Sequence, residues 1–317
     1  MKKILSIILT IALLFSFTAC GNKENASAKP SERNIEVSEA TLRKWLDESV
    51  GMWEFAQRFF DDTIIYKTKL GTWAFAPVDT SLPQSDYNWD NLRHAGPIAN
   101  TEWEYYEDGD LKSIKGIDLS NYNVVDDWEA VKDSGVKFVM LRIGYRGYTK
   151  GGLVEDKKFF EYARAAAKQG LELGTYFVTQ AITVEEAIEE ANYAAAMMKK
   201  AGVDFSYPVA LDLEDAGSLD ARTANLSKSE RTEIIKAFCE RLKELGYTPM
   251  LYSAIRWYMD EMDLSQLTEY DKWFAQYFNR PFFPYEFQIW QYTSSGVVDG
   301  IQGNVDLNIC FKDYSKE

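Results

Sequence analysis

The chain has 317 residues, enough to bury one large core plus a smaller segment, and 15% of them are aromatic. Its net charge of −14 argues against nucleic acid as a partner and suits anionic lipid poorly. The single histidine, His94, would have to serve any zinc site or Ser-His-Asp triad. We therefore expect neither a metal nor another cofactor, and carboxylates remain as the chemical groups.

The first 19 residues are typical of a signal peptide. Lys2 and Lys3 precede an apolar stretch over 4–17, which is followed by small residues and Cys20. The run Phe17-Thr18-Ala19-Cys20-Gly21 resembles a bacterial lipobox, which implies cleavage before Cys20 and a lipid on its thiol. A plain secretory signal is the alternative. Either way we expect the mature protein outside the cytoplasmic membrane, lipid-anchored at Cys20 or secreted.

Two segments separate this leader from the main domain. Residues 20–36 are polar and predict a flexible tether. Residues 37–113 predict an N-terminal helical and hairpin extension that packs on the main domain. Apolar residues recur at helical spacing over 38–66, and glycines and prolines predict irregular structure over 67–100. An Asp-Gly turn at 108–109 predicts a hairpin.

From residue 114 onward, strand-like and helix-like patterns alternate. Strands are expected at 114–119, 136–143, 171–177, 207–213 and 248–253, and helices at 126–134, 155–169, 183–201, 227–245 and 255–262. Repeated βα units of this kind predict a parallel sheet. Three further strand-like runs, at 272–277, 286–291 and 303–309, leave no room for long helices. We therefore predict an α/β protein in which residues 114–317 form a TIM-like barrel of (β/α)5(β)3 type.

The most informative run is Pro208-Val209-Ala210-Leu211-Asp212-Leu213-Glu214-Asp215, a strand that ends in acid. Asp212 and Glu214 share one face of it, with Cα atoms roughly 6.5–7 Å apart. Two carboxylates this close titrate differently, which suits the cleavage of a glycosidic bond. We expect the pKa of Glu214 to be raised and Asp212 to stay ionised. Two acids at a solvated strand end are the alternative.

Other acids occur near predicted strand ends. Asp118 lies near the end of the first barrel strand and Asp306 lies in the last one. These strands become neighbours when the barrel closes, and active residues of such barrels gather at the C-terminal ends of the strands. Asp156 precedes a predicted helix and is expected to be a helix cap or a surface acid.

A series of short motifs runs through residues 114–311 in a fixed order. They include Gly116-Ile117-Asp118-Leu119-Ser120, Arg142-Ile143-Gly144-Tyr145, Gly174-Thr175-Tyr176-Phe177, the pair Asp212 and Glu214, Trp273-Phe274-Ala275-Gln276-Tyr277, Trp290-Gln291-Tyr292-Thr293-Ser294 and Val305-Asp306. In this order the chain resembles the glycoside hydrolase family 25 lysozymes, the Chalaropsis-type muramidases. The resemblance implies hydrolysis of the β-1,4 bond between N-acetylmuramic acid and N-acetylglucosamine in peptidoglycan glycan strands.

The resemblance also implies roles for individual residues. Glu214 matches the general acid, Asp212 the second acid of the pair, and Asp118 and Asp306 the flanking acids of the active site. The positions that would line the substrate groove are Tyr176, Tyr252, Tyr277, Trp290 and Tyr292. Arg142 lies in a matching strand and would orient the acids or the substrate. Some members carry another acid where this chain has Gln276. The stereochemical route stays open between retention, inversion and assistance by the N-acetyl group of the substrate.

Two rival functions fit the same pattern. One is a non-catalytic peptidoglycan-binding lipoprotein with a degenerate barrel, and the other is a glycosidase acting on another acetylated glycan. The presence of all four acids favours the enzyme, which we expect to be a monomer. Cys239 lies on an apolar helical stripe and is expected to be a small buried hydrophobe, with a disulfide to Cys310 as the alternative.

Overall fold

The computed structural model describes residues 36–48, 51–95, 102–218 and 220–316. The predicted signal peptide, Cys20 and nearly all of the tether lie outside these ranges. The chain divides into two compact units, one ending at Asp61 and the other spanning Asp62–Glu317. Across the described ranges, none of the helices has the length and apolar character needed to cross a membrane.

The first unit contains two short helices, α1 (Glu39–Glu48) and α2 (Met52–Gln57). The Arg58 guanidinium joins them by pairing with Glu48 at 2.8 Å and Glu54 at 3.1 Å. The helical spacing expected over 38–66 is therefore wrong at its C-terminal end, since residues from Thr63 onward form a strand. β-Branched Ile64 and Ile65 favour this extended conformation.

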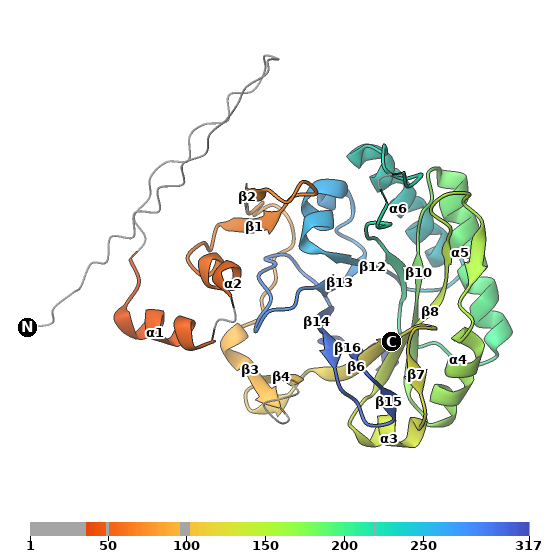
Figure 1. Cartoon of the computed structure of the whole chain (residues 1–317), viewed down its shortest axis with the longest axis horizontal. Helices are drawn as coiled ribbons and strands as arrows, with labels where there is room; N and C mark the ends of the chain where they lie inside the picture. Colours follow the sequence, from red (N-terminus) through yellow and green to blue (C-terminus); the bar gives the residue numbers. More distant parts are fainter. Residues whose placement is uncertain (1–35, 49–50, 96–101, 219, 317) are drawn as a thin grey trace, which may run out of the picture. The chain divides into compact units, whose positions relative to one another are not determined.

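Eight strands of the second unit close into a barrel (Figure 1). In barrel order they are β6 (Ile114–Leu119), β8 (Phe138–Arg146), β10 (Glu172–Val178), β11 (Val209–Asp212), β12 (Pro249–Ala254), β13 (Asp271–Ala275), β14 (Ile289–Gly296) and β16 (Val305–Cys310). Neighbours from β6 to β14 are parallel, whereas β16 is antiparallel to both β14 and β6. The predicted parallel sheet is thus confirmed except for its last strand. Residues 297–304 are too few for a parallel crossover, which needs a dozen or more.

Helices follow the first strands of the barrel. They are α3 (Trp128–Asp133), α4 (Phe159–Lys168), α5 (Val184–Ala201) and α6 (Lys228–Glu244). Helix α4 packs on β8 and β10, and α6 packs on β11 and β12, so helices cover the outer face of these strands (Figure 1). Ser227 and Glu230 begin α6 with a capping box. The helix predicted at 255–262 contains a short π-helical turn, Trp257–Glu261.

Several short strands lie outside the eight-stranded barrel. Residues 62–113 contribute β1 (Thr63–Lys67) paired with β2 (Trp73–Pro77), and the sheet of β3 (Leu92–Ala95), β4 (Glu102–Glu107) and β5 (Asp110–Leu111). The predicted hairpin is confirmed, because Asp108 (φ 51°) and Gly109 (φ 91°) form the turn between β4 and β5. The expectation of irregular structure over 67–100 is wrong at β2 and β3. At the barrel end, β7 (Val124–Val125) pairs with β15 (Ile301–Gln302), and β9 (Leu153–Glu155) pairs with β8.

Part of residues 62–113 covers strands that lack helices. The Trp89 ring stacks on Phe287 with centroids 5.9 Å apart, and Tyr87 lies 4.4 Å from Phe311. Ser85 donates its N–H to the Pro284 carbonyl at 2.7 Å, which ties the two backbones together. This segment therefore belongs to the same compact unit as the barrel. It covers the outer side of the barrel near β14 and β16, as helices cover the other strands.

Trp89→Ala should lower the free energy of unfolding by about 2 kcal/mol, because it removes a half-buried aromatic ring that packs on Phe287. Urea unfolding measures this value. Leu70→Ala is the control, since Leu70 is 89% exposed and its loss should cost less than about 0.5 kcal/mol. Equal, small effects in both variants would show that the segment does not stabilise the barrel.

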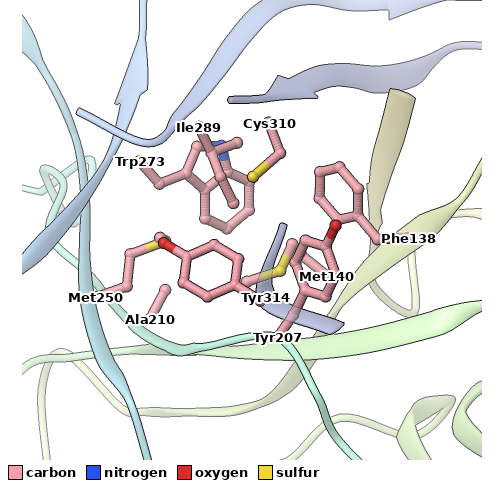
Figure 2. Close-up of a cluster of buried hydrophobic side chains, with 9 residues drawn as sticks. All are labelled: Phe138, Met140, Tyr207, Ala210, Met250, Trp273, Ile289, Cys310 and Tyr314. Carbon is pink, nitrogen blue, oxygen red and sulfur yellow. The ribbon is translucent and has the colours of Figure 1, made fainter. Parts of the chain in front are cut away.

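The interior of the barrel is filled by side chains below the strand ends that carry the acids. Figure 2 shows this cluster, in which the Phe138 and Tyr207 rings stack 4.5 Å apart. A Cβ at Gly116 would lie 2.2 Å from the Phe138 ring, so only glycine fits there. Ala210 lies in the cluster, and alternation along β11 therefore turns Asp212 into the barrel as well. Cys310 is also in the cluster and Cys239 is buried on α6; both are free thiols, so the disulfide alternative is wrong.

Candidate active site

Four acids meet at one end of the barrel. Asp118 lies near the end of β6, Asp212 is the last residue of β11, and Glu214 follows two residues later. Asp306 pairs directly with Asp118 across the β16–β6 ladder. Because β16 runs antiparallel, the beginning of this strand reaches the same end of the barrel as the C-terminal ends of the others. Asp118 and Asp212 are buried, Asp306 is half-buried and Glu214 is exposed.

Burial raises the pKa of all four acids, and the charges of neighbouring carboxylates add to this rise for Asp118, Asp212 and Glu214. Burial raises the pKa of Asp212 well above its usual range, and the charges of Glu214 and Asp118 raise it further. Desolvation also raises the pKa of Glu214, followed by the charges of Asp215 and Asp306. The expectation that Asp212 stays ionised is contradicted by the direction of this shift, because the pKa of Asp212 is raised. Asp212 lies deeper than Glu214 and is the harder of the two to ionise. The carboxyl groups of the cluster therefore keep their protons to higher pH than free carboxyls do.

Two buried amides fix the orientation of Asp118. Asn308 Nδ2 and Gln291 Nε2 both donate to its Oδ2, at 2.8 and 2.9 Å. Trp273 Nε1, which can only donate, gives its hydrogen to Asn308 Oδ1 at 2.7 Å and so sets the direction of that amide. Oδ2 of Asp118 is thus an acceptor of two hydrogen bonds. Burial, followed by the charge of Asp306, raises the pKa of Asp118 well above its usual range.

Arg142 is held beside the acids by Asp156. The Arg142 Nε donates to Asp156 Oδ2 at 2.8 Å, and its Nη2 donates to Asn121. Asp156 is buried, so the expectation of a surface acid is wrong, although it does accept the Lys158 N–H just before α4. The Arg142 charge opposes the rise in pKa of both Asp212 and Glu214.

Three of the predicted groove residues face the acids. Tyr252 and Tyr277 donate their hydroxyls to Gln291 Oε1, at 2.9 and 2.8 Å, and Tyr277 is 49% exposed. Tyr176 on β10 pairs with Arg142 on the neighbouring strand β8, and burial followed by the Asp118 charge raises the pKa of Tyr176. These tyrosines and Arg142 therefore surround the acid cluster.

Trp290 and Tyr292 do not line the groove. Both are buried, and their rings lie 5.5 Å apart on the face of β14 opposite to Gln291. Trp290 Nε1 donates to the Gln276 carbonyl at 2.8 Å, and its ring lies 6.4 Å from Trp89. Their assignment to substrate binding is therefore corrected to packing on the outer face of the barrel. The Gln276 side chain also serves the fold, because its Oε1 accepts the Phe282 N–H at 2.7 Å.

Sequence reasoning missed three polar residues that build the site: Asp156, Gln291 and Asn308. Asn308 lies two positions after Asp306, so the alternation of side chains along a strand could have placed it on the same face. In the part of the chain that the structure describes, no group of three or more His, Cys, Asp or Glu residues has an arrangement suited to a metal ion.

Comparison with known proteins identifies the family of the chain. Residues 117–301 match the family model described as glycosyl hydrolases family 25. The chain belongs to this family. As a family 25 member it is a glycoside hydrolase, and the four-acid cluster is its candidate active site.

Relatives and solved structures agree with this membership. YegX of Escherichia coli strain K12 is 27% identical over 207 residues, which cover 62% of this chain and 69% of YegX. The autolytic lysozyme of Clostridium acetobutylicum is 25% identical over 196 residues, 62% of this chain and 55% of that protein. The modular autolysin LytC from Streptococcus pneumoniae has a similar fold, with a TM-score of 0.57 at 22% identity over 83% of this chain and 57% of LytC. Another LytC structure contains a synthetic peptidoglycan ligand. The chain therefore spans little more than half the length of the autolytic lysozyme and of LytC.

Gln291→Met should reduce kcat roughly tenfold and lower the free energy of unfolding by about 1–3 kcal/mol. The substitution takes a donor from Asp118 and the shared acceptor from Tyr252 and Tyr277. Activity assays and thermal unfolding measure the two effects.

The matched control for this variant is Gln288→Met. Gln288 is also buried, and it bonds the Lys272 backbone away from the acids. It should lose similar stability but keep wild-type kcat. Equal activity of the two variants would contradict the role given to Gln291.

Proposed function

We propose that the protein is a peptidoglycan hydrolase that cleaves the β-1,4 bond between N-acetylmuramic acid and N-acetylglucosamine. The observation that carries the proposal is the pairing of an exposed Glu214 with a buried Asp212 at the barrel end. A relative named as an autolytic lysozyme, and a protein of similar fold solved with a peptidoglycan ligand, support this class of substrate.

Glu214 supplies the proton in the proposed mechanism. The oxygen of the leaving sugar must gain a proton as the glycosidic bond breaks, and an exposed glutamate with a raised pKa is suited to donate it. Once deprotonated, Glu214 takes a proton from the water that completes hydrolysis. The same side chain thus acts first as acid and then as base.

Asp212 is suited to orient the substrate. Its buried Oδ1 has no hydrogen-bond partner within the described chain, which is costly for a carboxylate oxygen. The N–H of a substrate acetamido group would satisfy this atom and favour the ionised form of Asp212. The acetamido oxygen then attacks the anomeric carbon as the bond to the leaving sugar breaks, and water opens the resulting ring with net retention. This is the substrate-assisted route.

Purified cell walls provide the test. The proposal expects loss of turbidity, with mass spectrometry showing released saccharides that carry N-acetylmuramic acid at the reducing end. Binding to walls without release of sugars would instead support a degenerate binding module. Release from a different acetylated glycan, but not from peptidoglycan, would support the other rival function.

We also propose that the protein is anchored to the outer side of the membrane through Cys20, on the strength of the motif Phe17–Gly21. Cys20→Ala should release the protein into the medium or leave it unprocessed, as membrane fractionation and mass measurement would show. Ser27→Ala, in the tether, is the control and should fractionate like the wild type. A Cys20→Ala protein that is processed and still partitions fully with the membrane would contradict the anchor.

A further inference from the structure

Glu214 lies just beyond the ladder of β11, so residues on either side of it must hold it in place. On one side, Leu213 donates its N–H to the Tyr252 carbonyl at 3.0 Å and accepts Ser253 Oγ at 2.6 Å. On the other side, Asp215 Oδ2 accepts Arg256 Nη2 at 2.6 Å. The two neighbours of Glu214 are thus both held: Leu213 by the backbone and a side chain of β12, and Asp215 by an ion pair to the turn that follows β12.

The ion pair continues into a network of alternating charges. Arg256 Nη1 pairs with Glu261 Oε1 at 2.7 Å, and Arg231 Nε lies 3.0 Å from Glu261 Oε2. Both guanidinium groups lie over the Trp257 ring, at 5.7 Å for Arg256 and 5.0 Å for Arg231. The side chains of Arg256 and Glu261 are only 14% and 16% exposed, whereas that of Asp215, at the end of the network, is 48% exposed. An ion pair that belongs to such a network holds its geometry better than an isolated surface pair.

We propose that Asp215 and Arg256 are positioning residues for Glu214, which hold it over the barrel end and control how much negative charge faces it. The inference rests on the proposed role of Glu214 as proton donor. It adds to that role that the Asp215 carboxylate and its Arg256 partner together set the negative charge that Glu214 faces.

The charges around Glu214 make this requirement testable. The ionisable groups that face it from the surrounding elements are Asp212, Asp215, Asp306, Arg142, Tyr252 and Tyr277. Among the carboxylates, Asp215 contributes most to the raised pKa of Glu214, ahead of Asp306. Arg256 offsets the Asp215 charge. Removing Asp215 therefore makes the surroundings of Glu214 less negative, whereas removing Arg256 makes them more negative.

The sign of each effect follows from the need for a protonated Glu214. Activity falls as pH rises through the pKa of this group. Asp215→Asn lowers that pKa, so the alkaline limb of kcat/KM should move to lower pH by about half a unit. Arg256→Gln leaves the Asp215 charge without its partner and should move the limb to higher pH by a similar amount. Arg256→Lys keeps the charge and should restore the wild-type limb.

The experiment measures pH profiles of kcat/KM for the full chain on solubilised cell-wall glycan, with thermal unfolding of each variant. In the double variant, Arg256→Gln should add little to Asp215→Asn, because the charge that it unmasks is gone. Loss of activity in both single variants without a shift of the limb would overturn the inference and leave a merely structural role. If Arg256→Gln does not fold, the direction of the Asp215→Asn shift decides. Near wild-type activity of Glu214→Gln would instead overturn the proposed function itself.

Discussion

Glu214→Gln is expected to lose roughly 10²–10⁴-fold in kcat on purified cell walls, the contribution typical of general acid catalysis. Glutamine has nearly the same shape as glutamate but cannot deliver a proton to the leaving oxygen. The exposed position of Glu214 makes it the member of the cluster that can reach this oxygen most readily. Binding of wall fragments should persist, because the tyrosines and Arg142 that face the site are unchanged.

Turnover and binding are measured separately, by release of reducing sugars and by co-sedimentation with walls. Glu233→Gln provides the matched control, since this glutamate lies on the exposed side of α6. Its kcat should equal that of the wild type. Retention of near wild-type turnover by Glu214→Gln on intact peptidoglycan would refute its role as proton donor.

Asp212→Asn should lose activity as severely and yet make the fold more stable at neutral pH. Burial raises the pKa of Asp212 well above the ordinary value of 3.8, so the folded protein binds a proton that the unfolded chain has released. Stability therefore falls as pH rises from the unfolded pKa towards the folded one. Asparagine cannot ionise and is free of this loss. The residual activity of the variant should still fall at alkaline pH with the pKa of Glu214.

Thermal unfolding between pH 3 and pH 8 provides the measurement. The melting temperatures of wild type and Asp212→Asn should be close at the acid end, and the variant should gain on the wild type as pH rises. Asp204→Asn, at an exposed position, should alter neither the activity nor this pH dependence. A variant less stable than the wild type at neutral pH would show that the Asp212 carboxylate has a stabilising partner.

The two variants describe a site in which function opposes stability. A carboxyl group buried without a partner for one of its oxygens costs free energy in the unliganded protein. The same oxygen is available to a substrate amide. The buried amides on Asp118 are the contrasting case, since every polar atom there has a partner and the group mainly holds its neighbours in place.

Much of the fold was accessible from local patterns in the sequence. The alternation of apolar runs placed most of the barrel strands within a few residues, because strands and helices differ in the period of their buried positions. The Asp-Gly turn located the β4–β5 hairpin, since these residues accept a positive φ. The acids at 118, 212, 214 and 306 were also found from sequence, because strand ends of a closed barrel must meet.

Tertiary structure alone decided which face of a strand is the interior. Alternation predicts that Trp290 and Tyr292 share a face opposite to Gln291, but not which face points to the acids. An outer strand face is ordinarily covered by a helix, and here it is covered by a segment around Trp89 that is far away in sequence. The depth of Asp212 and the burial of Asp156 were decided in the same way. The spacing of residues along a strand decides which side chains share a face, whereas the solvation of each side chain, and hence its pKa, depends on chain segments brought to it only by folding.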